Sequence, residues 1–289
     1  MRLNTRILAA GLLLWANLGL VHGAAQAASP SEVHFDSLDG TPLKAWLFQP
    51  AAAPRGTVVA LHGCGGLYAT AGARKGLLNA RHQAMAEMLL GEGYAVLLPD
   101  SLTPRGVAEL CTQKIGQRHI DQTERRADAL AALAWVAAQP WGQAERIALL
   151  GWSHGGSAVL SATDRTRREV AAQPVRPAVA IAFYPGCSAA LKSGYQPDTR
   201  LALMLGELDD WTPPAPCIAL GQAVGAELNV YPGSYHDFDN PVGTVRVRAD
   251  VPNGVHPGQG VHVGRNPAAR EAAYERVRAL LREALPEKR

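Results

Sequence analysis

Residues 151–156, Gly-Trp-Ser-His-Gly-Gly, have the types and spacing of a turn that presents a nucleophile. The apolar run 146–150 before them predicts a strand, and the small residues 157–162 after them predict a helix. In such a turn the serine hydroxyl projects at the helix N-terminus, where unpaired backbone N–H groups can stabilise a developing anion. We therefore expect Ser153 to be a nucleophile in acyl transfer. The alternative is a Gly-rich turn in which the serine only caps the helix.

A serine hydroxyl becomes a good nucleophile only when a base removes its proton and an acid holds that base in one tautomer. His236 lies in the loop that leaves the last predicted strand, where its ring can reach back over the sheet. Asp209 and Asp210 both follow the predicted strand 201–206. We expect Asp209 to be the acid because it lies three residues beyond the strand end, with Asp210 as the second choice. Alternatively, this acidic run merely caps a helix that begins near Pro213.

A Gly-rich loop, His-Gly-Cys-Gly-Gly at 62–66, follows the predicted strand 57–61. Its glycines allow backbone N–H groups to approach a substrate carbonyl, so the N–H groups of Cys64 and His154 are the expected oxyanion donors. Gly-rich loops also bind phosphate, but no Lys-Ser/Thr pair follows this one and the dinucleotide fingerprint is not matched. An oxyanion hole is therefore the preferred interpretation.

Further apolar runs supply the elements that must position these loops. An N-terminal hairpin is predicted over 32–36 and 43–48, and three helices over 77–92, 121–138 and 267–284. Other strands are predicted at 94–98, 177–183, 200–205 and 226–231. Strands that alternate with helices indicate an α/β fold, with a mostly parallel sheet covered on both faces and loops gathered at the carboxyl ends of the strands. The Gly-, Pro- and Val-rich segment 241–266 is predicted to be a short hairpin or lid at that end.

The first thirty residues have the pattern of a secretory signal peptide: a positive start, a short apolar stretch and an Ala-Gln-Ala end at Ala27. About fifteen apolar residues are fewer than the roughly 20 that cross a bilayer comfortably, although an uncleaved anchor helix is the alternative. We expect residues 1–27 to be removed and 28–289 to form one domain. The mature chain is then periplasmic or secreted, without a stable membrane anchor.

The chain has 28 Lys and Arg against 25 Asp and Glu, a net charge of +3. This balance gives no reason to expect nucleic acid as a partner. The even number of cysteines favours disulfides in an exported protein; three pairings are possible, and four buried thiols are the alternative. No pair has metal-site spacing, so neither a metal nor another cofactor is predicted. The cysteines are Cys64, Cys111, Cys187 and Cys217.

Taken together, these motifs resemble the dienelactone hydrolase family, which has the α/β-hydrolase fold. The resemblance extends over roughly residues 31–285 and implies a doubly wound sheet with a Ser-His-Asp triad. It assigns the nucleophile, acid and base to Ser153, Asp209 and His236. The motifs that carry it are 62–66, 151–156, 206–213 and 231–236.

This chain departs from the family pattern at the nucleophile. The founding enzymes use a cysteine thiolate that is held by a glutamate on the Gly-rich loop, whereas here the turn has Ser153 and the loop has His62 and Cys64 without a carboxylate. A serine with full base assistance suits ordinary esters. The resemblance therefore implies the fold and the triad more strongly than it implies dienelactone as substrate.

An exported member of this family would accommodate two disulfides. Cys187 and Cys217 follow neighbouring predicted strands at the same end of the sheet, so we expect them to pair. Cys64 and Cys111 would form the second bridge and tie the oxyanion loop to the long loop 99–120. Aromatic side chains near the motifs could line a pocket, or could simply pack beside the nucleophile turn. These are Trp152, Tyr184 and Trp211.

The favoured function is hydrolysis of a small ester or lactone through an acyl-enzyme. A prolyl-oligopeptidase-type peptidase shares the Gly-x-Ser-x-Gly-Gly motif, but no propeller or other gating domain is predicted. A non-catalytic binding protein with a hydrolase fold would be favoured by loss of a triad residue, and all three residue types are present. The sequence makes no prediction of the acyl and alcohol groups or of the oligomeric state.

Overall fold

The computed structural model of this chain describes residues 30–286. The predicted signal peptide 1–27 and its cleavage point lie outside the described residues. Within them, no helix is both long enough and apolar enough to cross a bilayer.

A single eight-stranded sheet organises the fold, with the strand order β1-β2-β4-β3-β5-β6-β7-β8. β1 and β2 form the predicted antiparallel hairpin, β2 pairs antiparallel with β4, and every later pairing is parallel. The mostly parallel α/β sheet expected from the sequence is therefore confirmed. Its strands are β1 (Ser31–Asp36), β2 (Pro42–Phe48), β3 (Thr57–Leu61), β4 (Ala95–Asp100), β5 (Ile147–Trp152), β6 (Val179–Phe183), β7 (Arg200–Gly206) and β8 (Glu227–Tyr231).

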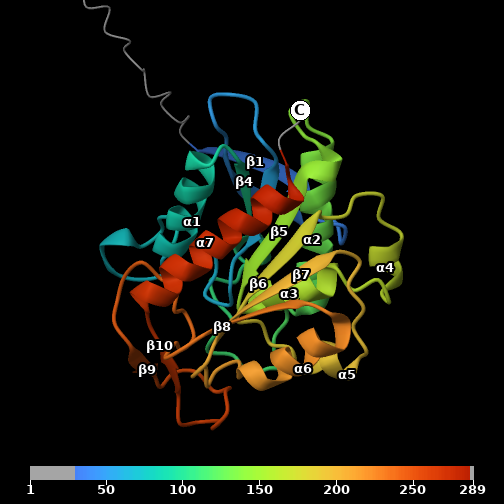
Figure 1. Cartoon of the computed structure of the whole chain (residues 1–289). Coiled ribbons are helices and arrows are strands. Elements are labelled where there is room, and N and C mark those ends of the chain that lie inside the picture. The colour runs from blue at the N-terminus through green and yellow to red at the C-terminus, as the bar shows by residue number, and fades with distance from the viewer. Residues whose placement is uncertain (1–29, 287–289) are drawn as a thin grey trace, which may run out of the picture.

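Helices cover both faces of the sheet. α1 and α7 lie over one face, while α2, α3 and α6 lie over the other (Figure 1). Successive residues of β3 divide between the two faces, since Val58 packs with α1 and α7 and Val59 packs with α2 and α3. The helices are α1 (Ala80–Gly91), α2 (Gln122–Ala137), α3 (His154–Ala162), α4 (Arg168–Ala171), α5 (Ser188–Lys192), α6 (Pro214–Val224) and α7 (Pro267–Ala284).

Local sequence determines where the helices begin. Asp121 caps α2 and forms a capping box with Glu124, which satisfies backbone donors at both positions. The helix predicted over 77–92 starts later, at Ala80, because the side chain of Asn79 accepts from the N–H of Arg81 and Leu78 pairs with Tyr68 instead. Boundaries thus follow the caps rather than the apolar periodicity.

The segment 241–266 contains the predicted hairpin, formed by β9 (Arg246–Arg248) and β10 (Val261–Val263). β10 continues toward the sheet through a bridge between Val263 and His236, and the N–H of Gly264 donates to the His236 carbonyl. The hairpin therefore lies at the carboxyl ends of the parallel strands, directly against the loop that carries His236.

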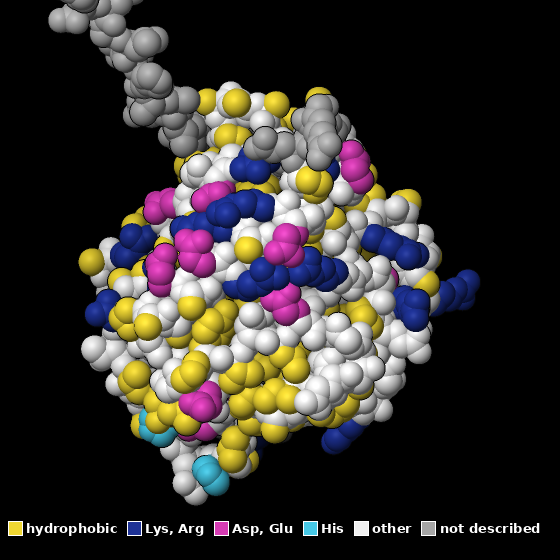
Figure 2. Space-filling view, viewed as in Figure 1, with side chains coloured by type: hydrophobic (Ala, Val, Ile, Leu, Met, Phe, Trp, Pro, Cys, Tyr) yellow, Lys and Arg dark blue, Asp and Glu magenta, His cyan; other side chains and the backbone are white. Residues whose placement is uncertain are grey.

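The face that carries α7 has cations and anions intermixed (Figure 2). Arg276 and Arg200 each form ion pairs with both Glu227 and Glu283. Because these pairs neutralise one another locally, this face has no extended field of a single sign.

Candidate active site

Ser153 connects β5 to α3 in a backbone conformation that few non-glycine residues adopt, with φ 53° and ψ −115°. Two glycines make the turn possible. A Cβ on Gly151 would lie 2.3 Å from the carbonyl oxygen of Gly155, and a Cβ on Gly155 would lie 2.1 Å from that of Leu61. The tight turn predicted from the sequence is therefore present, with its serine at the helix N-terminus.

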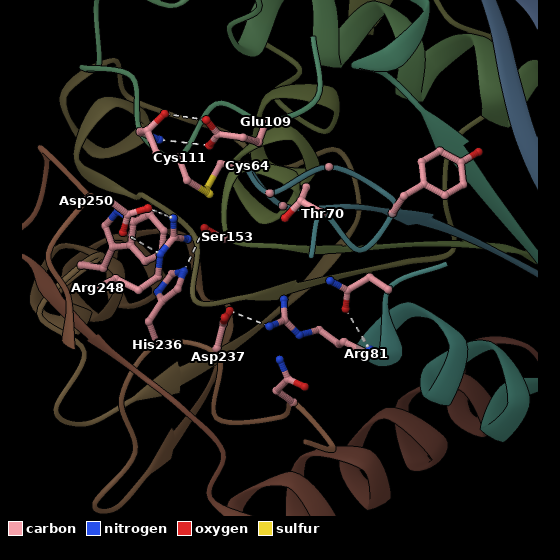
Figure 3. A pocket seen from close by; sticks show the side chains of 18 of the residues that line it. Cys64, Thr70, Arg81, Glu109, Cys111, Ser153, His236, Asp237, Arg248 and Asp250 are labelled. Atoms are coloured by element: carbon pink, nitrogen blue, oxygen red, sulfur yellow. Dashed lines mark hydrogen bonds and ion pairs between the residues drawn. A yellow bond between two sulfur atoms is a disulfide. The ribbon is translucent and has the colours of Figure 1, made fainter. Parts of the chain in front are cut away.

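Three side chains from three loops form a continuous hydrogen-bonded chain. His236 Nε2 lies 2.9 Å from Ser153 Oγ, and His236 Nδ1 lies 2.8 Å from Asp209 Oδ2. All three residues are buried, with 1% exposure for His236. The structure thus brings together the predicted nucleophile, base and acid, and Figure 3 shows His236 aimed at Ser153.

Backbone donors fix Asp209 in this orientation. Its Oδ1 accepts from the N–H groups of Trp211 and Thr212, both at 2.9 Å, and this leaves Oδ2 to face His236. Thr212 Oγ1 adds a further contact to Oδ2 at 3.0 Å. Protein donors therefore satisfy both oxygens of this side chain where it contacts the imidazole.

Asp210, the alternative acid, points away from His236. Its Oδ2 lies 2.7 Å from Nδ1 of His262, and its Oδ1 accepts from the His262 backbone N–H at 2.8 Å. The ring of His262 stacks on Tyr235 at a centroid distance of 4.8 Å. Asp210 thus joins the acid loop to the β9–β10 hairpin.

The two expected oxyanion donors flank Ser153. Cys64 lines the cavity beside Ser153, and His154 is the first residue of α3. Within residues 30–286, neither backbone N–H donates to another protein group. The loop is held by fully buried Arg125, whose Nη2 donates to the His62 carbonyl at 2.7 Å. Both N–H groups are therefore free to bind a substrate oxygen.

Two disulfides lie at this end of the molecule, and they join the pairs expected from the sequence. Cys64–Cys111 attaches the oxyanion loop to the loop that follows β4, and Cys187–Cys217 joins the residue before α5 to α6. Among the described residues, no three His, Cys, Asp or Glu side chains converge as a metal site would require.

The family model for dienelactone hydrolases matches residues 43–285 of this sequence. The chain belongs to the dienelactone hydrolase family. It is therefore related to hydrolases of the α/β-hydrolase superfamily, as the motifs suggested. A comparison with curated proteins gives no match.

Solved structures share the fold at low sequence identity. A dienelactone hydrolase-like promiscuous phosphotriesterase from metagenomic libraries has a TM-score of 0.65 at 20% identity, covering 89% of this chain and 98% of its own. Esterase 2 of Thermogutta terrifontis, phosphorylated by paraoxon, has a TM-score of 0.57 at 17% identity and coverages of 88% and 94%. Dienelactone hydrolase from Anabaena variabilis has a TM-score of 0.57 at 19% identity, with coverages of 88% and 98%.

A cavity of about 510 Å³ opens onto Ser153 and His236. Its walls come from the oxyanion loop, the start of α1, the loop after β4 and the hairpin. Trp211 lines it, as predicted. Trp152 and Tyr184 do not; the structure corrects that expectation, because both rings are buried in the core beneath the turn, with 0% and 1% exposure.

The polar atoms of those two buried aromatics reveal a group that the sequence analysis missed. Trp152 Nε1 and Tyr184 OH donate to the two oxygens of Asp239, at 2.8 and 2.6 Å. Arg81 reaches the same carboxylate with Nε at 3.3 Å and binds Asp237 with Nη2 at 2.6 Å. One buried network thus connects the residue before Ser153 with the residues after His236.

Neighbouring carboxylates keep Arg81, the cationic member of this network, protonated. Burial alone would lower the pKa of Arg81, but Asp237 and Asp239 outweigh it and hold that pKa above its usual value. Burial raises the pKa of Asp239, which Arg81 offsets only partly. The sequence signal was Arg81 itself, one charged residue on the apolar face of a helix with Met85 and Leu89.

Proposed function

We propose that this chain is an exported serine hydrolase that cleaves a small carboxylic ester or lactone through an acyl-enzyme. Ser153 is the nucleophile, His236 the general base and Asp209 the acid that orients it. The observation that carries this proposal is the unbroken pair of contacts, 2.9 Å from Ser153 to His236 and 2.8 Å from His236 to Asp209. This is the arrangement that activates a serine hydroxyl.

In the first half of the reaction, Ser153 Oγ attacks the carbonyl carbon while its proton moves to His236 Nε2. The carbonyl electron pair moves onto oxygen, and the N–H groups of Cys64 and His154 stabilise the resulting oxyanion. When the intermediate collapses, the bond to the alcohol oxygen breaks and His236 returns the proton to that oxygen. A lactone opens in the same step, and its alcohol stays attached to the acyl chain.

In the second half, water replaces the serine as nucleophile. His236 Nε2 removes a proton from the water as its oxygen attacks the acyl carbon, and the second tetrahedral intermediate expels Ser153, which recovers its proton. The proton on Nδ1 stays on the His236 ring and is hydrogen-bonded to Asp209 throughout. Nε2 is therefore the nitrogen that exchanges protons in the reaction.

Export is supported by the N-terminal pattern and by the two disulfides, because disulfides persist in oxidising compartments. The disulfide Cys64–Cys111 lies beside the cavity, so an oxidised state belongs to the working site.

The replacement Ser153→Ala tests the mechanism. We expect kcat for p-nitrophenyl acetate to fall by at least roughly 10⁴-fold, because the covalent route is lost, while circular dichroism stays unchanged. Ser193→Ala replaces an exposed serine directly after α5; it is the matched control and should retain full activity. Turnover by Ser153→Ala at the wild-type rate would remove Ser153 from the mechanism.

An inhibitor gives an independent readout of the nucleophile. The Thermogutta terrifontis esterase is described as phosphorylated by paraoxon. We expect paraoxon to inactivate this chain with a 1:1 stoichiometry, and peptide mass spectrometry should locate the phosphoryl group on Ser153.

A further inference from the structure

The cavity around Ser153 has an unusual lining for a ligand site. Among the described residues that line it, none has an aliphatic side chain, and Tyr68 and Trp211 are its only large aromatics besides histidine. Small-molecule pockets are generally lined mainly by hydrophobic and aromatic groups. Long alkyl chains would therefore find little apolar surface here and would strip water from polar groups without replacing their hydrogen bonds.

Trp211 does not compensate for this, since protein groups already cover part of its ring. The guanidinium of Arg248 lies over it at 5.5 Å from the centroid, and the ring of His236 lies 4.6 Å away. The Trp211 ring thus packs against Arg248 and His236 and does not present an open apolar surface to a ligand.

The charges around the cavity are balanced and partly paired. Arg81 binds Asp237 at 2.6 Å, and Arg248 makes two parallel contacts with Asp250 at 2.8 and 3.1 Å. Figure 3 shows both pairs facing the space in front of Ser153. Such pairs present donors and acceptors side by side without a net charge. The six charged lining residues are Arg81, Arg246, Arg248, Glu109, Asp237 and Asp250.

We propose that this cavity binds a neutral, hydroxyl-rich group, a sugar or similar polyol, as the larger part of the ester. This rests on the proposed hydrolase function and adds its substrate class. Each hydroxyl both donates and accepts, so adjacent hydroxyls match a guanidinium–carboxylate pair. A ligand with a net charge of either sign would meet as many like charges as opposite ones on this wall, and an alkyl group would leave the ion pairs unsolvated.

Two acetate esters built on a six-membered ring test this proposal. Methyl 6-O-acetyl-glucopyranoside and cyclohexylmethyl acetate both carry a primary acetate on a six-membered ring, but only the sugar has hydroxyls. We expect kcat/KM to be at least tenfold higher for the sugar ester, through a lower KM. Equal values, a preference for the cyclohexyl ester, or no cleavage of the sugar ester would overturn the substrate class. Cleavage of p-nitrophenyl acetate that depends on Ser153 would still leave the hydrolase function standing.

The charge preference is tested separately. Methyl 3-O-acetyl-glucuronide carries a carboxylate where methyl 3-O-acetyl-glucoside has its 6-hydroxymethyl group, so this pair keeps the acetate in one place and differs in charge. We expect its kcat/KM to be lower than that of the glucoside and to change little between low and high salt. A higher value that falls steeply with salt would overturn the neutral preference.

Variants of the hairpin test whether Arg248 and Asp250 bind the hydroxyls of the substrate. Arg248→Met keeps an apolar stem over Trp211 but removes the guanidinium, and Asp250→Asn removes the opposite charge. We expect the ratio of kcat/KM for the sugar ester to that for the cyclohexyl ester to fall about tenfold in each. Arg165→Met, an exposed arginine outside the cavity, is the control and should leave the ratio unchanged. An unchanged ratio in both hairpin variants would exclude this wall.

Discussion

At the residue scale, the decisive arrangement is that two adjacent carboxylates serve two different histidines. Asp209 binds His236 while Asp210 binds His262, because neighbouring side chains in this loop diverge. Two backbone N–H groups of this loop donate to one oxygen of Asp209. They hold the side chain so that its other oxygen faces the base. Asp209 is therefore the carboxylate that contacts His236, which supports its proposed role as the acid of the triad.

Substitution of the two aspartates separates their roles. Asp209→Asn should lower kcat by roughly 10³–10⁴-fold, because an amide no longer stabilises the imidazolium. Asp210→Asn should lower kcat less than tenfold, since it weakens only the contact to the hairpin. Steady-state kinetics with p-nitrophenyl acetate compares them, and a larger loss in Asp210→Asn would reassign the acid.

The sequence allowed much of this site to be predicted at the same scale. Ser153 and His236 could be located because each lies in a loop that leaves a recognisable strand. Asp239 could not, since nothing in its local sequence indicates that Trp152, at the end of β5, and Tyr184, just after β6, converge on it. Long-range burial of this kind depends on how β5 and β6 pack against the loop after β8. For the same reason the sequence leaves open whether Trp152 and Tyr184 line the pocket or pack beside the turn, and the structure shows packing.

At the element scale, the two disulfides differ in their distance from the active-site cavity: one lines it and the other does not. Cys64–Cys111 connects the loop with a candidate oxyanion donor to the loop after β4, and the Leu110 N–H also donates to the Cys64 carbonyl at 2.7 Å. Cys187–Cys217 joins the residue before α5 to α6, and neither of its cysteines lines the cavity. The two bridges should therefore affect stability alike and catalysis differently.

Paired serine substitutions check this difference. By the chain-entropy model, removal of either bridge should cost roughly 4 kcal/mol of unfolding free energy, measured by urea denaturation. Cys64→Ser with Cys111→Ser should also lower kcat about tenfold or more, because a candidate oxyanion donor loses its anchor. Cys187→Ser with Cys217→Ser should keep kcat per folded molecule, as counted by paraoxon titration. Equal kcat in both double variants would contradict a role for the first bridge in catalysis.

The sequence predicts those elements well that show either a continuous apolar run, as β3 and β5 do, or a long helical period, as α7 does. The expected segments of β3, β5 and α7 agree with the observed ones to within about two residues, because periodicity and caps point the same way. The short α4 and α5 were missed, since four or five residues are too few to show a helical period.

At the scale of the whole molecule, the core contains several imidazoles that stay neutral. Burial lowers the pKa of His82 to about 3 and holds those of His62 and His154 well below the usual value. All three pack around the sheet end that carries Ser153. In the unfolded chain these rings regain an ordinary pKa near 6.5 and take up protons more readily than the folded chain.

Stability should therefore fall as the pH falls below about 6.5. Between pH 7 and pH 5 His82 should remove about 2 kcal/mol of unfolding free energy; His62 and His154 should act in the same direction, and Asp239 in the opposite one. Urea denaturation at the two pH values measures the loss, and His82→Asn should reduce it by about 2 kcal/mol. An unfolding free energy that is the same at both pH values would show that these rings are not neutral and buried together.

The β9–β10 hairpin has a consequence for how this chain can diversify. The backbone N–H of Gly264, at its end, donates to the carbonyl of His236, while Arg246 and Arg248 line the cavity. A lineage that shifts to a new ester can exchange exposed side chains such as Arg246 at little cost. A change in the length of the segment would instead displace the backbone of His236, and with it the imidazole, and would lower kcat. Evolution of recognition in this branch should therefore proceed by point substitution at constant hairpin length.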